Sequence, residues 1–135
     1  MNEWAQDAIH NRLQYVRQMY TCLFEASLQG QTCFDPLFFH YPLDNNTYSR
    51  IESTFVFANT LMVLPVTIPD AFFVTGYFPA GRWVDINDLS TIVVECPDDN
   101  LDCYGTYGEL IDIDVSDIDD SQVDAYIMPG KILAF

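Results

Sequence analysis

The sequence predicts a mostly β protein with an N-terminal α-helix, in which the helix leads into an antiparallel β-sandwich. Three short runs rich in β-branched and aromatic residues, at residues 55–57, 61–66 and 72–85, carry this prediction. Asn, Asp, Pro and Gly residues separate them, and short apolar runs bounded by such turn-forming residues are typical of β-strands. Pairs of strands are only marginally stable alone, so we expect a second layer to cover their apolar face.

Composition limits the classes of function that the chain can serve. Its 135 residues suffice for one domain, or for one small domain with an attachment, and 50% of them are hydrophobic, which is ample for a packed core. The formal net charge is -15. Charge of this sign repels phosphate backbones and anionic lipid, so we expect no nucleic-acid partner and no membrane partner. Sugars, cations and proteins remain as candidate ligands.

One amphipathic segment, from Trp4 to Leu28, precedes the β-rich part. Its apolar residues recur at spacings of three and four, which predicts one helix ended by Gly30. The apolar stripe consists of Ile9, Leu13, Val16, Tyr20 and Leu23. No other helix is predicted to share this surface, so we expect an exposed apolar patch that marks a missing partner.

Five other segments are predicted to be extended. Prolines favour extended backbone in residues 32–42. Strict alternation of isoleucine and aspartate predicts that residues 110–115 form a strand with one buried face. The five segments are residues 32–42, 91–96, 110–115, 125–128 and 132–135. A surface turn at residues 44–47 is predicted to separate the helical front from the β-rich remainder.

Two features suit an oxidising compartment. Asn45-Asn46-Thr47 is an N-glycosylation sequon, so Asn45 is a candidate glycosylation site. Four cysteines in a small acidic chain fit such a compartment as well. Yet the chain opens without the basic region and apolar segment of a signal peptide, and no run reaches membrane-spanning length. We therefore expect a chain cut from something longer.

The cysteines fall into two pairs with different expectations. Cys96 and Cys103 close a turn-rich acidic loop, which makes them a candidate disulfide worth roughly 2 kcal/mol, with the reduced pair as the alternative. Cys22 and Cys33 have no neighbours that would activate a nucleophile. We expect both of these to be buried small apolar residues.

Histidines and aromatic residues could carry chemistry, but a structural role is favoured for each. His10 and His40 have no cysteine or carboxylate at ligand spacing, so we expect no metal site around them. Trp83, Tyr77 and Phe78 could stack on sugar rings. Within a strand-turn-strand pattern such residues more often fill the core, and that is the prediction.

The acidic tract near the C-terminus has a partial calcium-binding pattern. Asp112, Asp114 and Ser116 match the first three ligand positions of an EF-hand loop. Asp117 replaces the glycine that such loops require, and Val123 replaces the final glutamate. We therefore expect no calcium site, and a solvated strand face explains the tract.

Two groups of motifs follow one another in a specific order. The first group comprises Arg12, Tyr20-Thr21, Glu25-Ala26, Gly30, Pro36-Leu37-Phe38-Phe39 and Tyr41-Pro42. The second comprises Leu61-Met62-Val63, Pro65-Val66, the stretch from Thr75 to Asp85, and Gly130 with Ile132-Leu133. In this order and spacing they resemble glycoside hydrolase family 31, which includes the α-glucosidases, maltases and lysosomal acid α-glucosidase. The first group resembles the last barrel helix and its exit, and the second resembles the domain after the barrel.

The resemblance implies a retaining α-glycosidase built on a (β/α)8 barrel and followed by a proximal β-sandwich. Residues 1–43 would be the tail end of the barrel, and residues 44–135 would be the sandwich. The family carries its nucleophile and its acid/base on barrel aspartates ahead of the last helix, so this chain is expected to lack both. No catalytic, cofactor-binding or metal-binding residue is therefore assigned, and we expect the chain alone to be inactive.

The resemblance also implies a role in the parent enzyme. The chain would support the barrel, the remainder of the barrel would be its partner, and α-glucosides would be substrates of the parent only. The parent would be secreted, or lysosomal or otherwise endomembrane. A free-standing β-sandwich that binds carbohydrate or a protein partner is the alternative.

Four positions depart from the family pattern. Asp35 stands where the family has an arginine, and Arg17 where it has a proline. Ala58 replaces a glycine, and Met128 replaces an arginine. Asp35 is the largest of these changes, because it reverses a charge.

Overall fold

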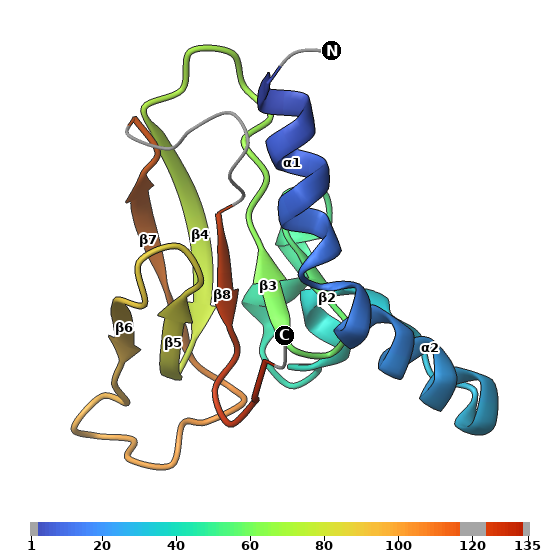
Figure 1. Cartoon of the computed structure of the whole chain (residues 1–135). Helices are drawn as coiled ribbons and strands as arrows, with labels where there is room; N and C mark the ends of the chain where they lie inside the picture. Colours follow the sequence, from blue (N-terminus) through green and yellow to red (C-terminus); the bar gives the residue numbers. More distant parts are fainter. Residues whose placement is uncertain (1–2, 117–123, 134–135) are drawn as a thin grey trace.

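Two antiparallel β-sheets share one core in the computed structural model, which describes residues 3–116 and 124–133 (Figure 1). One sheet has six strands in the order β1-β2-β3-β8-β5-β6, and the other pairs β4 with β7. The strands are β1 (Phe34–Pro36), β2 (Phe55–Phe57), β3 (Leu61–Val63), β4 (Phe73–Pro79), β5 (Gly81–Asp85), β6 (Thr91–Val94), β7 (Gly108–Asp114) and β8 (Ala125–Ile127). The predicted mostly β fold, with helix ahead of antiparallel sheets, is confirmed.

A tight turn within a three-residue loop, residues 58–60, joins β2 to β3. Ala58 and Asn59 have φ values of 52° and 58°, and the Thr60 amide donates to the Phe57 carbonyl oxygen at 3.0 Å. Positive φ at both central residues defines a type I′ turn, whose twist matches that of the paired strands. Glycine adopts this conformation at no steric cost, so alanine is the less favourable residue at position 58.

The chain crosses from the two-stranded sheet to the six-stranded sheet between β4 and β5. Gly81 has φ 142°, and a Cβ atom there would lie 2.6 Å from Pro129 Cγ. Only glycine fits so close an approach. The Pro79-Ala80-Gly81 sequence is therefore the corner that lets one continuous run of residues serve both sheets.

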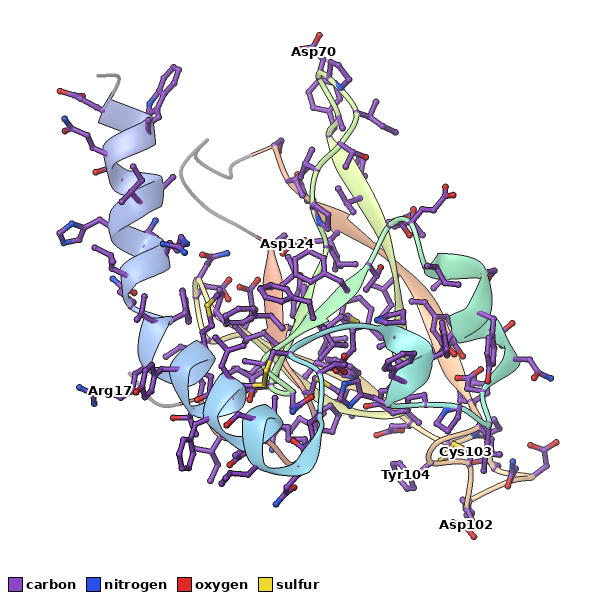
Figure 2. The ribbon with its side chains drawn as sticks, turned by 90° about the vertical axis from the view of Figure 1, so that its right-hand side faces the viewer. Arg17, Asp70, Asp102, Cys103, Tyr104 and Asp124 are labelled. Atoms are coloured by element: carbon purple, nitrogen blue, oxygen red, sulfur yellow. A yellow bond between two sulfur atoms is a disulfide. The ribbon has the colours of Figure 1, made fainter. Side chains whose placement is uncertain are left out.

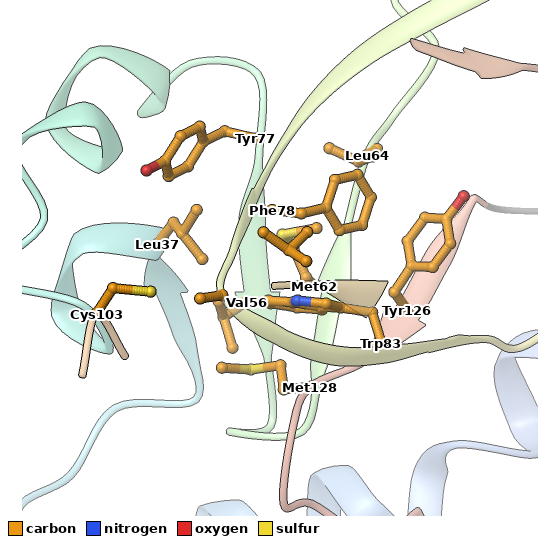
Figure 3. Close-up of a cluster of buried hydrophobic side chains, with 12 residues drawn as sticks. Leu37, Val56, Met62, Leu64, Tyr77, Phe78, Trp83, Cys103, Tyr126 and Met128 are labelled. Atoms are coloured by element: carbon orange, nitrogen blue, oxygen red, sulfur yellow. The ribbon is translucent and has the colours of Figure 1, made fainter. Parts of the chain in front are cut away.

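The core lies between the sheets, and both contribute to it. Phe78 of β4 makes edge contacts with Trp83 of β5 and Tyr126 of β8, at ring-centroid distances of 5.5 and 5.0 Å (Figure 3). The Trp83 indole donates to the Pro79 carbonyl oxygen at 2.8 Å. Trp83 and Phe78 are fully buried, and Tyr77 is 3% exposed. The prediction that these aromatic residues fill the core is confirmed.

The predicted single N-terminal helix is wrong in one respect, because two helices occupy the segment. They are α1 (Glu3–Leu13) and α2 (Val16–Gln29). The amides of Gln14 and Tyr15 bond three residues back, to Asn11 and Arg12, and Tyr15 has ψ 0°. This tightened turn redirects the chain, so that α2 leaves the line of α1 (Figure 1). Gly30 ends α2 in the left-handed conformation, as predicted.

Other segments differ from the sequence predictions in detail. Within 32–42 only β1 is a strand, and the 3-10 helix η1 (Leu37–Phe39) follows it. The turn at 44–47 is part of a longer 3-10 helix, η2 (Asn45–Arg50). Residues 131–133 are not a strand, and the rest of that predicted segment lies outside the described residues, as do Asp117 and Val123 of the rejected calcium loop.

Candidate functional site

The helices present an apolar face that the rest of the described chain leaves uncovered. No residue of α1 is buried, and α2 buries only Cys22. The predicted stripe is exposed at every position: Ile9 52%, Leu13 56%, Val16 40%, Tyr20 74% and Leu23 52%. All five apolar side chains of the predicted stripe are therefore exposed, two on α1 and three on α2.

A groove of about 570 Å³ runs beside this face, between the helices and the six-stranded sheet. Aromatic and aliphatic side chains dominate its walls, and no carboxylate lines it. The lining residues are Ala8, Asn11, Arg12, Gln14, Tyr15, Val16, Met19, Phe34, Phe55, Phe57, Leu61, Val63, Ile86, Asn87 and Ala125. Ligand pockets are commonly apolar with few polar groups, so the groove and the stripe together form the candidate site.

Covalent and polar contacts hold α2 against the sheet. Cys22 and Cys33 form a disulfide, with their Cα atoms 6.0 Å apart. The Gln18 side chain donates to Thr60 Oγ1 at 2.9 Å. The prediction that the two cysteines are only buried apolar residues is wrong. They are buried, but the turn after α2 brings them together across a separation of 11 residues.

The second cysteine pair lies on the opposite side of the core. Cys96 and Cys103 form a disulfide with Cα atoms 5.6 Å apart. Cys103 is fully buried in the main core, whereas Asp102 and Tyr104 on either side of it are exposed (Figure 2). Asn45, the candidate glycosylation site, is exposed at the start of η2.

Asp35 is a buried acid with side-chain partners on both carboxylate oxygens. Asp35 is 3% exposed, and its Oδ2 lies 3.2 Å from His40 Nε2. Thr32 Oγ1 donates to the other carboxylate oxygen. His40 therefore serves as the partner of a buried acid, while His10 is exposed on α1. Within the described residues, no three His, Cys, Asp or Glu side chains are placed to hold a metal ion.

One buried acid was missed by sequence reasoning. Asp124, just before β8, is 3% exposed, and in the part of the chain described its Oδ2 has no hydrogen-bond partner. Burial raises the pKa of Asp124 to about 6, a hydrogen bond with Tyr126 opposes this rise, and the charge of Asp85 adds to it. An aspartate followed directly by the apolar residues of a strand was the available sequence signal.

Two facing antiparallel sheets with a helical extension define a β-sandwich domain. The chain belongs to glycosyl hydrolase family 31, because the sequence model of that family's C-terminal domain matches residues 30–133. A solved cycloalternan-degrading enzyme from Trueperella pyogenes superposes with a TM-score of 0.75 at 16% identity, over 96% of this chain and 16% of that one. A solved Flavobacterium johnsoniae dextranase superposes with a TM-score of 0.69 at 21% sequence identity, over 89% of this chain and 13% of the dextranase. At these sequence identities, the similarity to the two solved enzymes shows a shared fold only.

Several sequence relatives are named as α-glucosidases. The chain is 40% identical to a probable α-glucosidase of Oryza sativa over 66% of its length, and 32% identical to an α-glucosidase of Hordeum vulgare over 83%. It is 34% identical to the lysosomal α-glucosidase of Bos taurus over 65%. These matches cover only 10%, 14% and 10% of the three relatives, so the chain corresponds to a small part of their length. No helix among the described residues is long and apolar enough to span a membrane.

Proposed function

We propose that the chain is the C-terminal part of an α-glucosidase-like enzyme that hydrolyses O-glycosyl bonds, and that its helical face packs against the rest of the catalytic polypeptide. The observation that carries this proposal is the exposed apolar stripe beside an apolar groove. A patch of this kind on a soluble domain signals a missing partner. In support, the family model begins at residue 30, so α1 and α2 precede the part it matches.

The proposed role is to support the barrel that carries the catalytic aspartates. Full burial of an aliphatic side chain stabilises by roughly 1.5–3 kcal/mol, and the five stripe residues are each only partly covered in this chain. Docking would therefore stabilise both parts, after the loss of freedom on association is subtracted. The disulfide between Cys22 and Cys33 would transmit this support from α2 to the sheet. The lysosomal relatives suit a parent in an oxidising or endomembrane compartment.

The test supplies the chain to a barrel that lacks its own C-terminal part. The Hordeum vulgare relative, truncated ahead of the segment that matches this chain, provides that barrel. We expect the two to elute together and to hydrolyse a chromogenic α-glucoside. Leu13→Glu and Tyr20→Glu place charges on the exposed apolar stripe, the proposed docking face. Each should abolish both co-elution with the barrel and hydrolysis of the α-glucoside.

The matched control lies away from that face. Leu101 is 74% exposed, as is Tyr20, but belongs to the loop closed by Cys96 and Cys103. Leu101→Glu should leave association and activity intact. Failure of the unaltered chain to associate, or equal damage by Leu101→Glu, would contradict the proposal.

A carbohydrate-binding role is the second candidate, and the aromatic lining of the groove favours it. Phe34 is 60% exposed and packs against Phe57, at a ring-centroid distance of 5.3 Å. Exposed rings stack on the apolar faces of sugars. Titration with maltose and isomaltose, followed by NMR, should then give saturable shifts that Phe34→Ala removes and Leu13→Glu preserves. Absence of saturable shifts would leave the first candidate alone.

A further inference from the structure

Asn45 opens a 3-10 turn in which the flanking polar groups have structural partners. The backbone N–H of Asn46 donates to Asp44 Oδ1 at 3.1 Å, and Thr47 Oγ1 donates to the backbone carbonyl oxygen of Asp44 at 2.8 Å. Asp44 and Thr47 are completely buried. The Asn45 side chain, by contrast, is exposed to solvent. The turn is therefore held by its neighbours, and Asn45 is available for modification.

We propose that Asn45 carries an N-linked glycan, and that the glycan is added before this turn folds. The donor is an oligosaccharide carried on a lipid pyrophosphate. Asn45 Nδ2 forms a bond to the sugar C1 atom and loses a proton, the bond from C1 to the pyrophosphate oxygen breaks, and the lipid pyrophosphate leaves. Asn45-Asn46-Thr47 is the only such acceptor triplet in the full sequence.

The order of events follows from the position of Thr47. The acceptor triplet requires a hydroxyl two residues after the asparagine, so the transferase must read that hydroxyl. In the folded chain Thr47 is completely buried and its hydroxyl is engaged with the Asp44 carbonyl oxygen. The folded turn therefore hides one of the two groups that the enzyme needs. Modification must precede folding or follow local unfolding.

The disulfides point to the compartment in which such a donor is found. All four cysteines are paired, as Cys22 with Cys33 and Cys96 with Cys103. Disulfides persist in oxidising compartments, which are also where N-linked glycans are attached. The paired cysteines and the acceptor triplet thus suit the same environment.

The proposed glycan would not obstruct the docking face. In Figure 2 the turn that carries Asn45 lies on the far side of the sheets from α1 and α2. The groove is lined by α1, the start of α2 and strands of the six-stranded sheet, with no residue of η2. Glycosylation is therefore compatible with the contact proposed for the helices.

The experiment offers the chain to solubilised oligosaccharyltransferase with a lipid-linked oligosaccharide. One sample is reduced and unfolded, and the other is folded and oxidised. We expect a single shift on a denaturing gel in the unfolded sample only, reversed by peptide N-glycosidase. Asn45→Gln should abolish the shift, whereas Asn100→Gln, at an exposed asparagine with no hydroxyl two residues on, should preserve it.

Each other outcome overturns part of the proposal. No shift in the unfolded sample, or a shift that persists in Asn45→Gln, would show that Asn45 is not an acceptor. Equal modification of the folded and unfolded samples would show that burial of Thr47 does not control the order. Circular dichroism of Asn45→Gln should match that of the unaltered chain, because the turn is held by Asp44 and Thr47.

Discussion

Tyr77 and Asp44 form a buried hydrogen bond that ties β4 to the turn before η2. The Tyr77 hydroxyl donates to Asp44 Oδ2 at 2.5 Å, and Asp44 is completely buried. Burial, followed by this hydrogen bond and the carboxylate charge, raises the pKa of Tyr77 well above its usual value. The tyrosine therefore stays protonated and donates at any physiological pH.

Removal of this hydroxyl should destabilise the fold. In Tyr77→Phe the buried Asp44 carboxylate loses a partner, and hydrogen bonds to charged groups contribute roughly 1.5–3 kcal/mol. We expect the free energy of unfolding to fall by that amount in denaturant titrations. Tyr104→Phe is the control, because Tyr104 is 65% exposed and its hydroxyl can bond to water. Equal stability of the two variants would contradict the role of the Tyr77 hydroxyl.

Asp124 should contribute more to the stability of the chain in mild acid than at neutral pH. Its pKa is raised by burial from 3.8 to about 6, so the folded state holds this proton more tightly than the unfolded chain. The resulting stability is fully present below pH 3.8 and is lost as the pH rises through 6. Between pH 4 and pH 7 the loss amounts to about 2–3 kcal/mol.

Asp124→Asn tests this dependence, since asparagine carries no charge at any of these pH values. The difference in free energy of unfolding between the variant and the unaltered chain should shift by about 2–3 kcal/mol in favour of the variant from pH 4 to pH 7. Denaturant unfolding at several pH values measures it, with Asp98→Asn at an exposed position as the control. A difference that does not vary with pH would rule out Asp124 as the group responsible.

At the scale of elements, the disulfide between Cys22 and Cys33 should hold α2 on the sheet. α2 buries only Cys22, so few other contacts fix it. A cross-link closing a loop of this length contributes about 2–3 kcal/mol. The double variant Cys22→Ser and Cys33→Ser should lose that amount and should lose hydrogen-exchange protection in α2 while β4 and β7 keep theirs. Unchanged protection in α2 would show that its helix needs no cross-link.

The strands were predictable from sequence, and the helix break was not. The strict alternation that predicted 110–115 as a strand reappears in β7, where Ile111 and Ile113 are half-buried and Asp112 is exposed. Residues 14–15 contain neither glycine nor proline, and the apolar period runs through them, so no local signal marked the break. The disulfide of Cys22 was missed for a related reason, because it depends on where α2 lies against β1.

At the scale of the whole molecule, the sequence predicted the exposed stripe but not the groove. The stripe follows from one local period and from the lack of another predicted helix to cover it. The groove joins residues as distant as Ala8, Phe57 and Ala125, and its shape depends on the angle between helix and sheet. The raised pKa of Asp124 depends on packing in the same way, because burial is its main cause. Long-range placement of this kind has no local signature.

The chain alone should hydrolyse no glycoside. Retaining glycosidases need two carboxyl groups about 5–5.5 Å apart across the scissile bond, one of them protonated. The apolar groove has no carboxylate in its lining, and the buried acid with a raised pKa, Asp124, does not line it. Purified chain incubated with a chromogenic α-glucoside from pH 4 to pH 7 should give no turnover above buffer, whereas an intact family relative serves as the positive control. Turnover that survives purification and disappears in Asp124→Asn or Asp85→Asn would instead place a catalytic carboxylate within this chain.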